Sequence, residues 1–401
     1  MFWFWFWWVH HGLMVVVDLA WWLLAMGLTR KPLWRLVISA FLAVQLACIV
    51  SGMAGVDWPS HVPRSVYLTV LVWHYLGLAL LLPVGAICGY AWIRRWLVRV
   101  RAARQEPPVA TLVGVNSLTR REFLGAAASL APPLFTIGLT SVAVARLDNL
   151  RLRRFTLAVP TLPRALDGMT LVHLTDLHIG QLSCARVLRE MADKTNALRP
   201  DLVLWTGDLI DYALSDLSGG IALVKAVEGR YGAWLTEGNH DLADDEGEFQ
   251  RRVKAAGVPL LLDESALTHV RGYPVQIFGL RWLSGADLHR DHVTALQVRE
   301  VLRNRQPDAF PILLSHHPHA FDAAVNADLP LTLAGHTHGG QLMLDSRHGL
   351  GSVMFRYWSG LYQRGRSQLI VSNGVGTWLP FRINAPAEIV HITLRCTEAR
   401  G

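Results

Sequence analysis

The sequence has 401 residues, enough for two or three domains, and 52% of them are hydrophobic whereas only 17% are charged. With a mean hydropathy of +0.28, this composition excludes an ordinary soluble enzyme. The whole formal net charge of +7 arises in residues 1–145, where eleven Lys and Arg residues stand against four acids. Because this excess accompanies apolar runs, we attribute it to arginines that flank membrane spans, and we expect no nucleic-acid partner.

Long apolar runs fill the first quarter of the sequence. Residues 2–28, 33–55 and 66–93 each contain at least the roughly 20 residues that a helix needs to cross a bilayer. Asp18 is the only acid within these runs. We therefore predict a transmembrane helical region with three spans over residues 1–105.

A fourth, weaker apolar run covers residues 122–145. Pro132 and Pro133 within it weigh against a straight helix, because each proline removes a backbone donor. Just before it, the segment TRREFL at 119–124 resembles a twin-arginine signal, which directs the export of folded proteins. We predict that residues 106–150 form a linker that carries this motif and the fourth span.

Basic residues on either side of the spans predict how the chain is oriented. By the positive-inside rule, the arginines after the first and third runs place the N-terminus outside and residues 94–121 in the cytoplasm. A fourth crossing then places everything after residue 146 on the extracytoplasmic side of a multi-pass inner-membrane protein. A further basic cluster argues for the cytoplasmic face as an alternative, and its members are Arg146, Arg151, Arg153 and Arg154.

From about residue 151 onward, the sequence is typical of a soluble α/β domain. Short apolar runs recur between polar or glycine-rich turns and indicate strands at 171–176, 201–208, 233–241, 275–280, 311–318 and 329–340. Helices are predicted at 184–198 and 292–305. Because strands and helices alternate, we expect a layered α/β architecture.

Five of these strand-like runs end in clusters of Asp, Asn and His. In α/β sheets, the loops beyond the carboxyl ends of the strands converge at one edge, and ligands bind there. Asp176 and His178 are two residues apart, so in an extended chain both side chains point the same way. His336 and His338 repeat this spacing. The sequence therefore predicts that five loops deliver polar side chains to one site.

The residue types in these clusters indicate metal binding. Carboxylate, amide and imidazole donors together suit Mn, Fe or Zn better than Ca, and the absence of a thiolate argues against a structural zinc site. Gly207 and Gly238 each precede a candidate ligand and permit a tight turn with a close approach of the backbone.

These motifs resemble those of the calcineurin-like metallophosphoesterase superfamily over roughly residues 165–395. The resemblance rests on Asp176-Leu177-His178, Gly207-Asp208-Leu209-Ile210-Asp211, Gly238-Asn239-His240-Asp241, Ser315-His316 and Gly335-His336-Thr337-His338. The chain is most similar to the membrane-linked bacterial branch that contains the YkuE and YaeI phosphodiesterases. The resemblance implies a metallophosphoesterase-type β-sandwich flanked by helices in four layers, with residues 151–401 as the catalytic domain after the α-helical transmembrane region.

The resemblance also implies two divalent metal ions, with Mn, Fe or Zn expected and Mg as an alternative. One ion would be held by Asp176, His178 and His338, and the other by Asn239, His316 and His336, while Asp208 would bridge the two. His240 would act beside the scissile bond without binding metal, Asp241 could orient its ring, and Asp211 would support Asp208 or its loop. His316 follows Ser315 directly and matches the family's ligand, with the adjacent His317 as the other candidate; His173 is expected to be an ordinary strand residue.

The implied function is that of a dinuclear metal-dependent phosphoesterase. Its substrate would be a phosphodiester or pyrophosphate, and the membrane anchor together with the resemblance suggests a lipid-linked one, as for UDP-diacylglucosamine hydrolases. The alternative is a non-catalytic membrane scaffold or sensor that retains the fold. A transport function of the N-terminal helices has little support, because Asp18 is the only acid in a span. The sequence does not indicate an oligomeric state.

Overall fold

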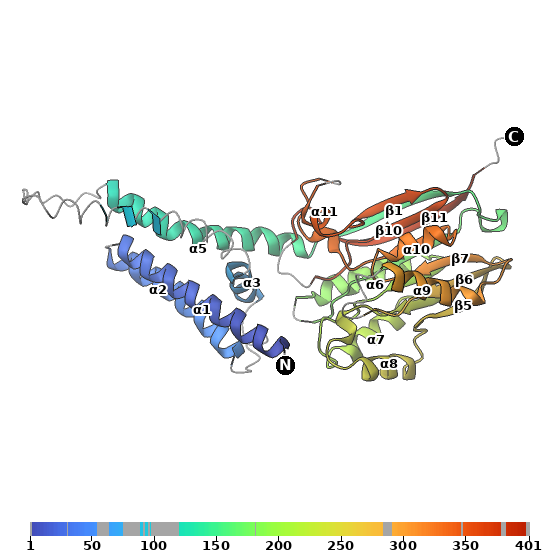
Figure 1. Cartoon of the computed structure of the whole chain (residues 1–401), viewed down its shortest axis with the longest axis horizontal. Coiled ribbons are helices and arrows are strands. Elements are labelled where there is room, and N and C mark those ends of the chain that lie inside the picture. The colour runs from blue at the N-terminus through green and yellow to red at the C-terminus, as the bar shows by residue number, and fades with distance from the viewer. Residues whose placement is uncertain are drawn as a thin grey trace, which may run out of the picture. The chain divides into compact units, whose positions relative to one another are not determined.

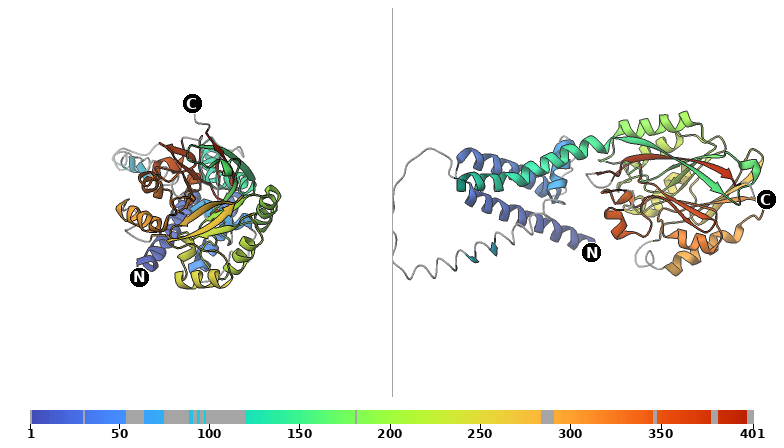
Figure 2. Two further views of the ribbon diagram at one scale, coloured as in Figure 1. Left: turned by 90° about the vertical axis from the view of Figure 1, so that its right-hand side faces the viewer. Right: turned by 90° about the horizontal axis from the view of Figure 1, so that it is seen from above.

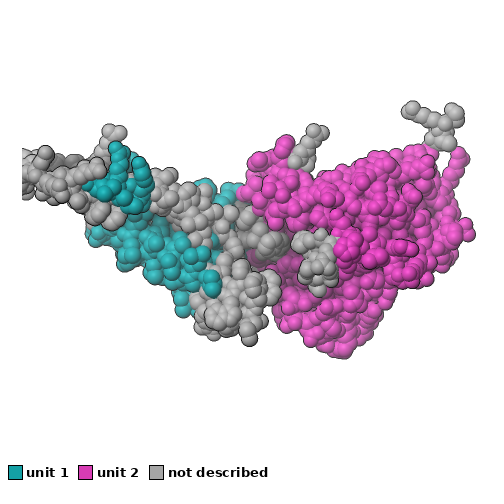
Figure 3. Space-filling model, in the orientation of Figure 1, with its two compact units in different colours: residues 1–144 teal, residues 145–401 magenta. Residues whose placement is uncertain are grey.

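The computed structural model describes residues 2–29, 31–53, 64–74, 120–180, 182–283, 291–345, 348–377 and 382–397, together with five residues between 89 and 97. These residues form two compact units, residues 1–144 and residues 145–401 (Figure 3). The finer boundaries predicted at residues 105 and 150 stay predictions.

The first unit is built from helices that are apolar on all sides, as membrane helices are. They are α1 (Phe2–Leu28), α2 (Pro32–Met53), α3 (Arg64–Val72) and α5 (Arg120–Leu147), whose end belongs to the second unit. The segments His11–Leu28, Pro32–Ser51 and Phe123–Leu147 are long and apolar enough to cross a membrane. The first, second and fourth predicted spans are therefore helices. Most of the third, residues 66–93, lies outside the described residues.

Helix α5 continues through Pro132 and Pro133, so the proline pair does not interrupt the fourth predicted span. Helices in lipid tolerate proline where other groups satisfy the backbone carbonyls that it affects. The twin-arginine-like motif begins outside the described residues and stays a prediction.

Asp18, the acid within α1, is buried and bonded to residues that follow α3. The Trp73 indole nitrogen donates to Asp18 Oδ1 at 2.6 Å, and His74 Nε2 lies 3.0 Å from Oδ2. An ionisable group at membrane depth needs such partners, because an unpaired one is costly in an apolar medium. These contacts support a role for Asp18 in packing the helices rather than in transport.

The second unit contains two sheets. The first has the strand order β1-β11-β2-β3-β4, and the second has the order β5-β6-β7-β8-β10-β9. The strands of the first sheet are β1 (Leu150–Val159), β2 (Thr170–Leu174), β3 (Leu202–Thr206), β4 (Ala233–Thr236) and β11 (Ala387–Cys396). Those of the second are β5 (Glu264–Val270), β6 (Tyr273–Gly279), β7 (Phe310–Leu314), β8 (Leu331–Ala334), β9 (Gly360–Arg364) and β10 (Ser367–Val371).

Parallel pairing aligns the strands that precede the candidate site. Strand β3 pairs in parallel with β2 and β4, and β8 pairs in parallel with β7 and β10. The carboxyl ends of these strands therefore lie at one edge of each sheet, as the sequence predicted. Six of the strands overlap the predicted runs, whereas β1, β5, β9, β10 and β11 were not predicted.

Helices cover the outer faces of both sheets (Figures 1 and 2). Their bounds are α6 (Ala185–Leu198), α7 (Leu217–Lys225), α8 (Glu246–Ala255), α9 (Asp291–Val301) and α10 (Ala320–Asn326), while the short helix α11 (Leu350–Met354) precedes β9. The helix predicted at 184–198 is α6, and its buried side includes Val187 and Met191 at helical spacing. The helix predicted at 292–305 is α9, which continues into a 3-10 turn at Leu302–Asn304.

Successive side chains of a strand point to opposite faces of the sheet, so each sheet contributes to two separate hydrophobic cores. On β2, Leu171 points into the core between the two sheets, and its neighbour Val172 joins the core beneath α6, α7 and α8. A third core contains Phe278 of β6 and Phe321 of α10 and lies between the second sheet and its helices. The structure thus has four layers, helix, sheet, sheet, helix, and confirms the predicted metallophosphoesterase-type architecture.

The arginine cluster at the start of the second unit has a structural role that the sequence did not reveal. Arg151 and Arg153 lie on β1, and β1 pairs in register with β11, so that both reach the buried carboxylate of Glu388. Arg151 Nη2 lies 2.6 Å and Arg153 Nη1 3.3 Å from its oxygens. These two charges therefore serve a buried acid, while the interpretation of the cluster as a topology signal stays a prediction.

We expect the double variant Arg151→Ala/Arg153→Ala to destabilise the second unit, because Glu388 would remain buried without its cations. Removing the partner of a buried charge costs about 3 kcal/mol or more, which corresponds to a fall in melting temperature of roughly 6–12 °C for a unit of this size. The measurement is thermal melting of the full chain in detergent. Arg154→Ala, an exposed position on the same strand, is the control and should change the melting temperature little. Equal melting temperatures for both variants would contradict this account.

Candidate active site

Loops that follow β2, β3, β4, β7 and β8 bring the predicted ligands together. Three groups of side chains have ligand atoms within 4.8 Å of one another: Asp176, His178 and His338; Asp208, His316 and His336; and His178, Asp208 and His240. The seventh predicted ligand, Asn239, places its Oδ1 2.9 Å from His336 Nδ1. All seven predicted ligands therefore surround one site.

The backbone at this site is unusual. Five of the seven predicted ligands have a positive φ: 52° at Asp176, 42° at His178, 52° at Asp208, 71° at His336 and 50° at His338. Each such residue stores roughly 1–3 kcal/mol of strain, which is typical of functional sites. The expectation that Asp176 and His178 converge through an extended chain is wrong, because β2 ends at Leu174 and the chain then turns sharply.

Glycines allow the loops after β3 and β4 to touch, as predicted. Gly207 has a φ of 87°, a conformation that other residues rarely adopt. A Cβ atom added to Gly238 would overlap the side chain and the backbone nitrogen of Asp208. Backbone bonds hold the loops after β2 and β3 in the same way, since the Asp176 amide donates to Gly207 O at 3.0 Å and that of His178 to Asp208 O at 3.1 Å.

Two buried carboxylates, Asp176 and Asp208, dominate the electrostatics of the site. Burial alone would raise the pKa of Asp208, but His316 and the other imidazoles hold it well below its usual value. Burial would also raise the pKa of Asp176, but nearby imidazoles, mainly that of His338, lower it. Burial would likewise lower the pKa of His316, but Asp208 and Asp176 raise it to about 9. The site therefore favours positive charge between these groups.

The imidazoles that face the carboxylates present metal-binding atoms. His316 Nδ1 donates to the Thr206 carbonyl at 2.6 Å, so Nε2 is the nitrogen that faces Asp208 Oδ2, at 3.0 Å. A cation bound by Nε2 would displace the proton that this nitrogen carries in the metal-free site. Similarly, His178 Nε2 and His338 Nε2 face each other at 3.0 Å. Lone pairs and carboxylate oxygens that converge in this way fit divalent cations.

The match to a family model agrees with this geometry. Residues 169–340 match the family model described as calcineurin-like phosphoesterase. The chain carries a calcineurin-like metallophosphoesterase domain. The domain belongs to a family of metal-dependent hydrolases, and its Asp and His clusters are those that could hold the metal.

Several similar proteins are named metallophosphoesterases, and the names of two of them also say that they are transmembrane proteins. The "Transmembrane protein with metallophosphoesterase domain" of Danio rerio is 31% identical over 249 residues, which are 59% of this chain and 55% of the relative. The chain thus spans about half the length of that relative. The protein of the same name in Bos taurus is 26% identical over 90% of this chain and 81% of its own. Metallophosphoesterase YkuE of Bacillus subtilis is 27% identical over 71% of this chain and 100% of its own.

A solved structure titled "Structural and Functional Characterization of a Novel Archaeal Phosphodiesterase" is also similar. It is 14% identical, with a TM-score of 0.30, over 53% of this chain and 87% of its own.

Asp211 and Asp241 exchange the roles predicted for them in the metallophosphoesterase domain. Asp241 does not orient His240; its carboxylate accepts bonds from the amides of Leu209, Ile210 and Gly238 at 2.8, 3.1 and 2.9 Å. It therefore ties the loops after β3 and β4 together. Burial, and then the charge of Asp208, raises its pKa to about 7.

Asp211 is the residue that orients the histidines. Its Oδ1 lies 3.2 Å from His178 Nδ1 and 3.2 Å from His240 Nδ1, and its carbonyl lies 2.7 Å from His240 Nδ1. Burial would lower the pKa of His240, but the bonds and charges of Asp211 and Asp208 raise it to about 9. The predicted roles of the two aspartates were exchanged because the order of residues in the sequence does not show which loop folds over the His240 ring.

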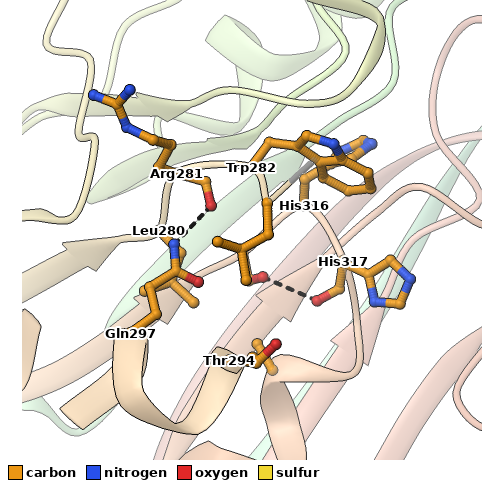
Figure 4. Close-up of a pocket in the computed structure, with 10 residues that line it drawn as sticks. Leu280, Arg281, Trp282, Thr294, Gln297, His316 and His317 are labelled. Atoms are coloured by element: carbon orange, nitrogen blue, oxygen red, sulfur yellow. Dashed lines mark hydrogen bonds between the residues drawn. The ribbon is translucent and has the colours of Figure 1, made fainter. Parts of the chain in front are cut away.

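The structure distinguishes the two adjacent histidines after β7. His316 points toward Asp208, whereas His317 joins none of the candidate metal groups found among the described residues. Instead, the His317 ring lies 5.0 Å from that of His336 and 5.8 Å from that of Trp282. Trp282, together with Thr294 and Gln297, lines a pocket beside His316 (Figure 4). Trp282 could not be recognised from the sequence, because it follows a strand without any motif.

Arg382 is a second residue that sequence reasoning missed. Its side chain is fully buried and donates to the carbonyls of Asn373 at 3.0 Å and Ala385 at 2.9 Å. Arg382 Nη2 also lies 3.2 Å from His338 Nδ1. Burial lowers the pKa of His338 to about 4, and the charges of His178 and Arg382 act in the same direction. The charge of Asp176 opposes this shift but does not overcome it. His338 therefore stays neutral, which is the form that binds metal. His173 is an ordinary buried strand residue of β2, as predicted.

We expect His316→Ala to remove metal from the purified full chain and His317→Ala to retain it. Only the first substitution removes a nitrogen that faces Asp208, whereas the second removes a ring that packs beside the site. The measurement is the metal-to-protein ratio by elemental analysis after loading with Mn²⁺ and removal of the excess. The adjacent substitutions serve as matched controls. Loss of metal from His317→Ala with full retention in His316→Ala would overturn the assignment.

Proposed function

We propose that this protein is a membrane-anchored phosphoesterase that hydrolyses a phosphodiester or pyrophosphate with two divalent cations. The observation that carries the proposal is the convergence of seven donor side chains, two of which are buried carboxylates. A non-catalytic scaffold or sensor has no need of this arrangement, which combines buried charge with strained backbone. The family supports phosphoester hydrolysis as the reaction type.

The geometry supports the distribution of ligands that the sequence suggested. Asp176, His178 and His338 would hold one cation, and Asn239, His316 and His336 the other, with Asp208 between them. The donor set, oxygen and imidazole without thiolate, suits Mn, Fe or Zn, with Mg as an alternative. When bound, such a pair polarises phosphoryl oxygens and acidifies a water for attack on phosphorus.

His240 is suited to act as the acid that protonates the leaving oxygen. Its Nδ1 is engaged by the Asp211 carbonyl at 2.7 Å, so a proton given to a substrate would come from Nε2. In the metal-free site, the bonds and charges of Asp211 and Asp208 raise the pKa of His240, which favours the protonated ring that an acid needs. The His240 ring lies 4.5 Å from that of His178, so it is next to the cluster that would bind the phosphoryl group.

We also propose that the substrate is lipid-linked. The support is indirect: the chain carries apolar helices long enough to cross a bilayer, and the last of them ends at Leu147, only two residues before β1. A catalytic domain tethered so closely to a membrane has bilayer phosphoesters within reach at high local concentration. The natural headgroup is left open by this argument.

The activity test uses the full chain in detergent with Mn²⁺ and bis-p-nitrophenyl phosphate. We expect metal-dependent turnover by the wild type. Asp208→Asn should bind no metal pair and show no turnover, because it removes a charge that both sites need. His240→Ala should retain the metal and lose about 10²–10⁴ in turnover, as when a general acid is removed.

The two variants separate the possible failures of this proposal. No metal-dependent turnover by a metal-loaded wild type would favour the scaffold alternative. If His240→Ala turns over substrate as fast as the wild type, His240 is not the general acid, and the proposed metal site is not affected by this result.

For sidedness, we propose that the catalytic domain lies on the extracytoplasmic side, with the cytoplasmic face as the alternative. Structural use of Arg151 and Arg153 weakens the main argument for the cytoplasmic face, because these charges serve Glu388. A reporter fused after residue 150, active only outside the cytoplasm, should be active. A parallel fusion of a reporter active only in the cytoplasm is the control, and activity of that fusion alone would refute the extracytoplasmic placement.

A further inference from the structure

An exposed apolar surface borders the metal site. It is formed by Leu344, Leu350, Val353 and Met354, whose exposed fractions are 76%, 44%, 84% and 62%, and we call it the α11 surface. Among the described residues of the second unit, these four make up half of the eight large hydrophobic side chains that are exposed. Clustering within eleven residues of sequence distinguishes them from scattered exposed side chains, and such clusters mark sites of interaction.

The α11 surface is held in place rather than projecting on a loose loop. The Leu350 amide donates to the Leu342 carbonyl at 2.9 Å, and Met343 pairs with Gly349 across the loop. Among the described residues of this loop, Asp345 and His348 pair with each other at 2.9 Å. The described part of the loop therefore presents its aliphatic groups on a hydrogen-bonded framework.

Hydrogen bonds connect this loop to the end of α5. Within the second unit, Arg146 Nη1 donates to Asn384 Oδ1 at 3.2 Å, and Asn384 Nδ2 donates to the Met343 carbonyl at 3.0 Å. Arg146 lies in the last turn of the candidate span Phe123–Leu147. The α11 surface thus lies at the end of the unit where the chain comes out of an apolar helix (Figure 1).

We propose that the α11 surface docks into the interface of the bilayer that α5 crosses. The bilayer is the occupant that the structure favours, because a helix of spanning length ends two hydrogen bonds away from the surface. Aliphatic groups at such a position gain by leaving water for the boundary between headgroups and acyl chains. Coverage by the N-terminal helices or by a second copy of the chain would be a different result of the test below.

Docking at this place would present the metal site to lipid headgroups. The α11 segment follows the ligand His338 through the turn His338–Gly340. At its other end, the Phe355 ring lies 5.7 Å from that of His336. Resting on the proposed function, this inference narrows the substrate to an amphiphile whose phosphoester lies at headgroup depth while its apolar part stays in the bilayer.

The first test measures docking without using activity. The full chain, with its own cysteines replaced, carries a fluorescent label at Val353→Cys and is reconstituted in phosphatidylcholine and phosphatidylglycerol vesicles. Brominated lipid should quench this label several-fold more than a label at Leu296→Cys, a control position on α9 that is 60% exposed. Aqueous iodide should show the opposite order.

Two outcomes of the quenching experiment would overturn the proposal. If iodide quenches the label at position 353 as strongly as the label at 296, and brominated lipid does not, the surface faces water. If neither quencher reaches position 353, protein covers the surface, and cross-linking from that position would show whether the cover is the same chain or a second copy.

The second test measures what docking does for turnover. Val353→Asp/Met354→Asp should reduce, by tenfold or more, the hydrolysis of a nitrophenyl phosphodiester that carries a long alkyl chain and is embedded in the same vesicles. Hydrolysis of soluble bis-p-nitrophenyl phosphate and the metal content should stay unchanged. An equal loss on both substrates would contradict docking and assign these residues to the integrity of the site. Failure of the wild type on both substrates would refute the phosphoesterase function, while the quenching result would still decide the docking proposal.

Discussion

The site depends on two carboxylates, Asp176 and Asp208, held together in the interior where neither can be hydrated. Two buried negative charges repel each other and lose solvation, so a structure that keeps them ionised must supply positive charge. The raised pKa of His316 and of His240 shows how strongly these carboxylates favour positive charge beside them. By contrast, the pKa of His336 falls to about 3 and that of His338 to about 4, mainly through burial. Neutral imidazoles beside ionised carboxylates are what a pair of cations requires.

Besides burying two carboxylates, the site requires a strained backbone. Asp176, Asp208 and His336 adopt left-handed conformations, which favour glycine over other residues. The surrounding bonds show how this strain is sustained: the His336 amide donates to both oxygens of Asp176 at 3.1 Å, and the His240 amide donates to Asp208 Oδ1 at 2.9 Å. Each carboxylate therefore fixes the loop that follows another strand. The same oxygens that would bind cations also keep the loops in register, so the site and its scaffold stabilise each other.

The sequence could predict which side chains gather at the site but not how the chain brings them there. Residue type and order were enough for Asp176, His178 and the other donors, because metal chemistry restricts the side chains to a few kinds. Parallel strands then explain why the donors meet at one edge. The exchange of roles between Asp211 and Asp241, the packing of Trp282 and the burial of Arg382 depend on contacts between loops far apart in sequence. Strand β1 was missed because its arginines, Arg151 and Arg153, read as a charged flank, although one face of the strand serves a buried acid.

That acid links the start of the domain to its metal site. Glu388 binds Arg151 and Arg153 on one side and accepts the Asn373 amide at 2.9 Å on the other. The Asn373 carbonyl in turn accepts Arg382, whose guanidinium lies beside His338. Glu388, Asn373 and Arg382 are buried, and each is bonded to the next, so removing one of them leaves a buried polar group without a partner. The strand that follows α5 thereby contributes to the position of His338, a candidate metal ligand. A domain without this strand would lose the partners of Glu388, and with them the start of the chain of bonds that ends at His338.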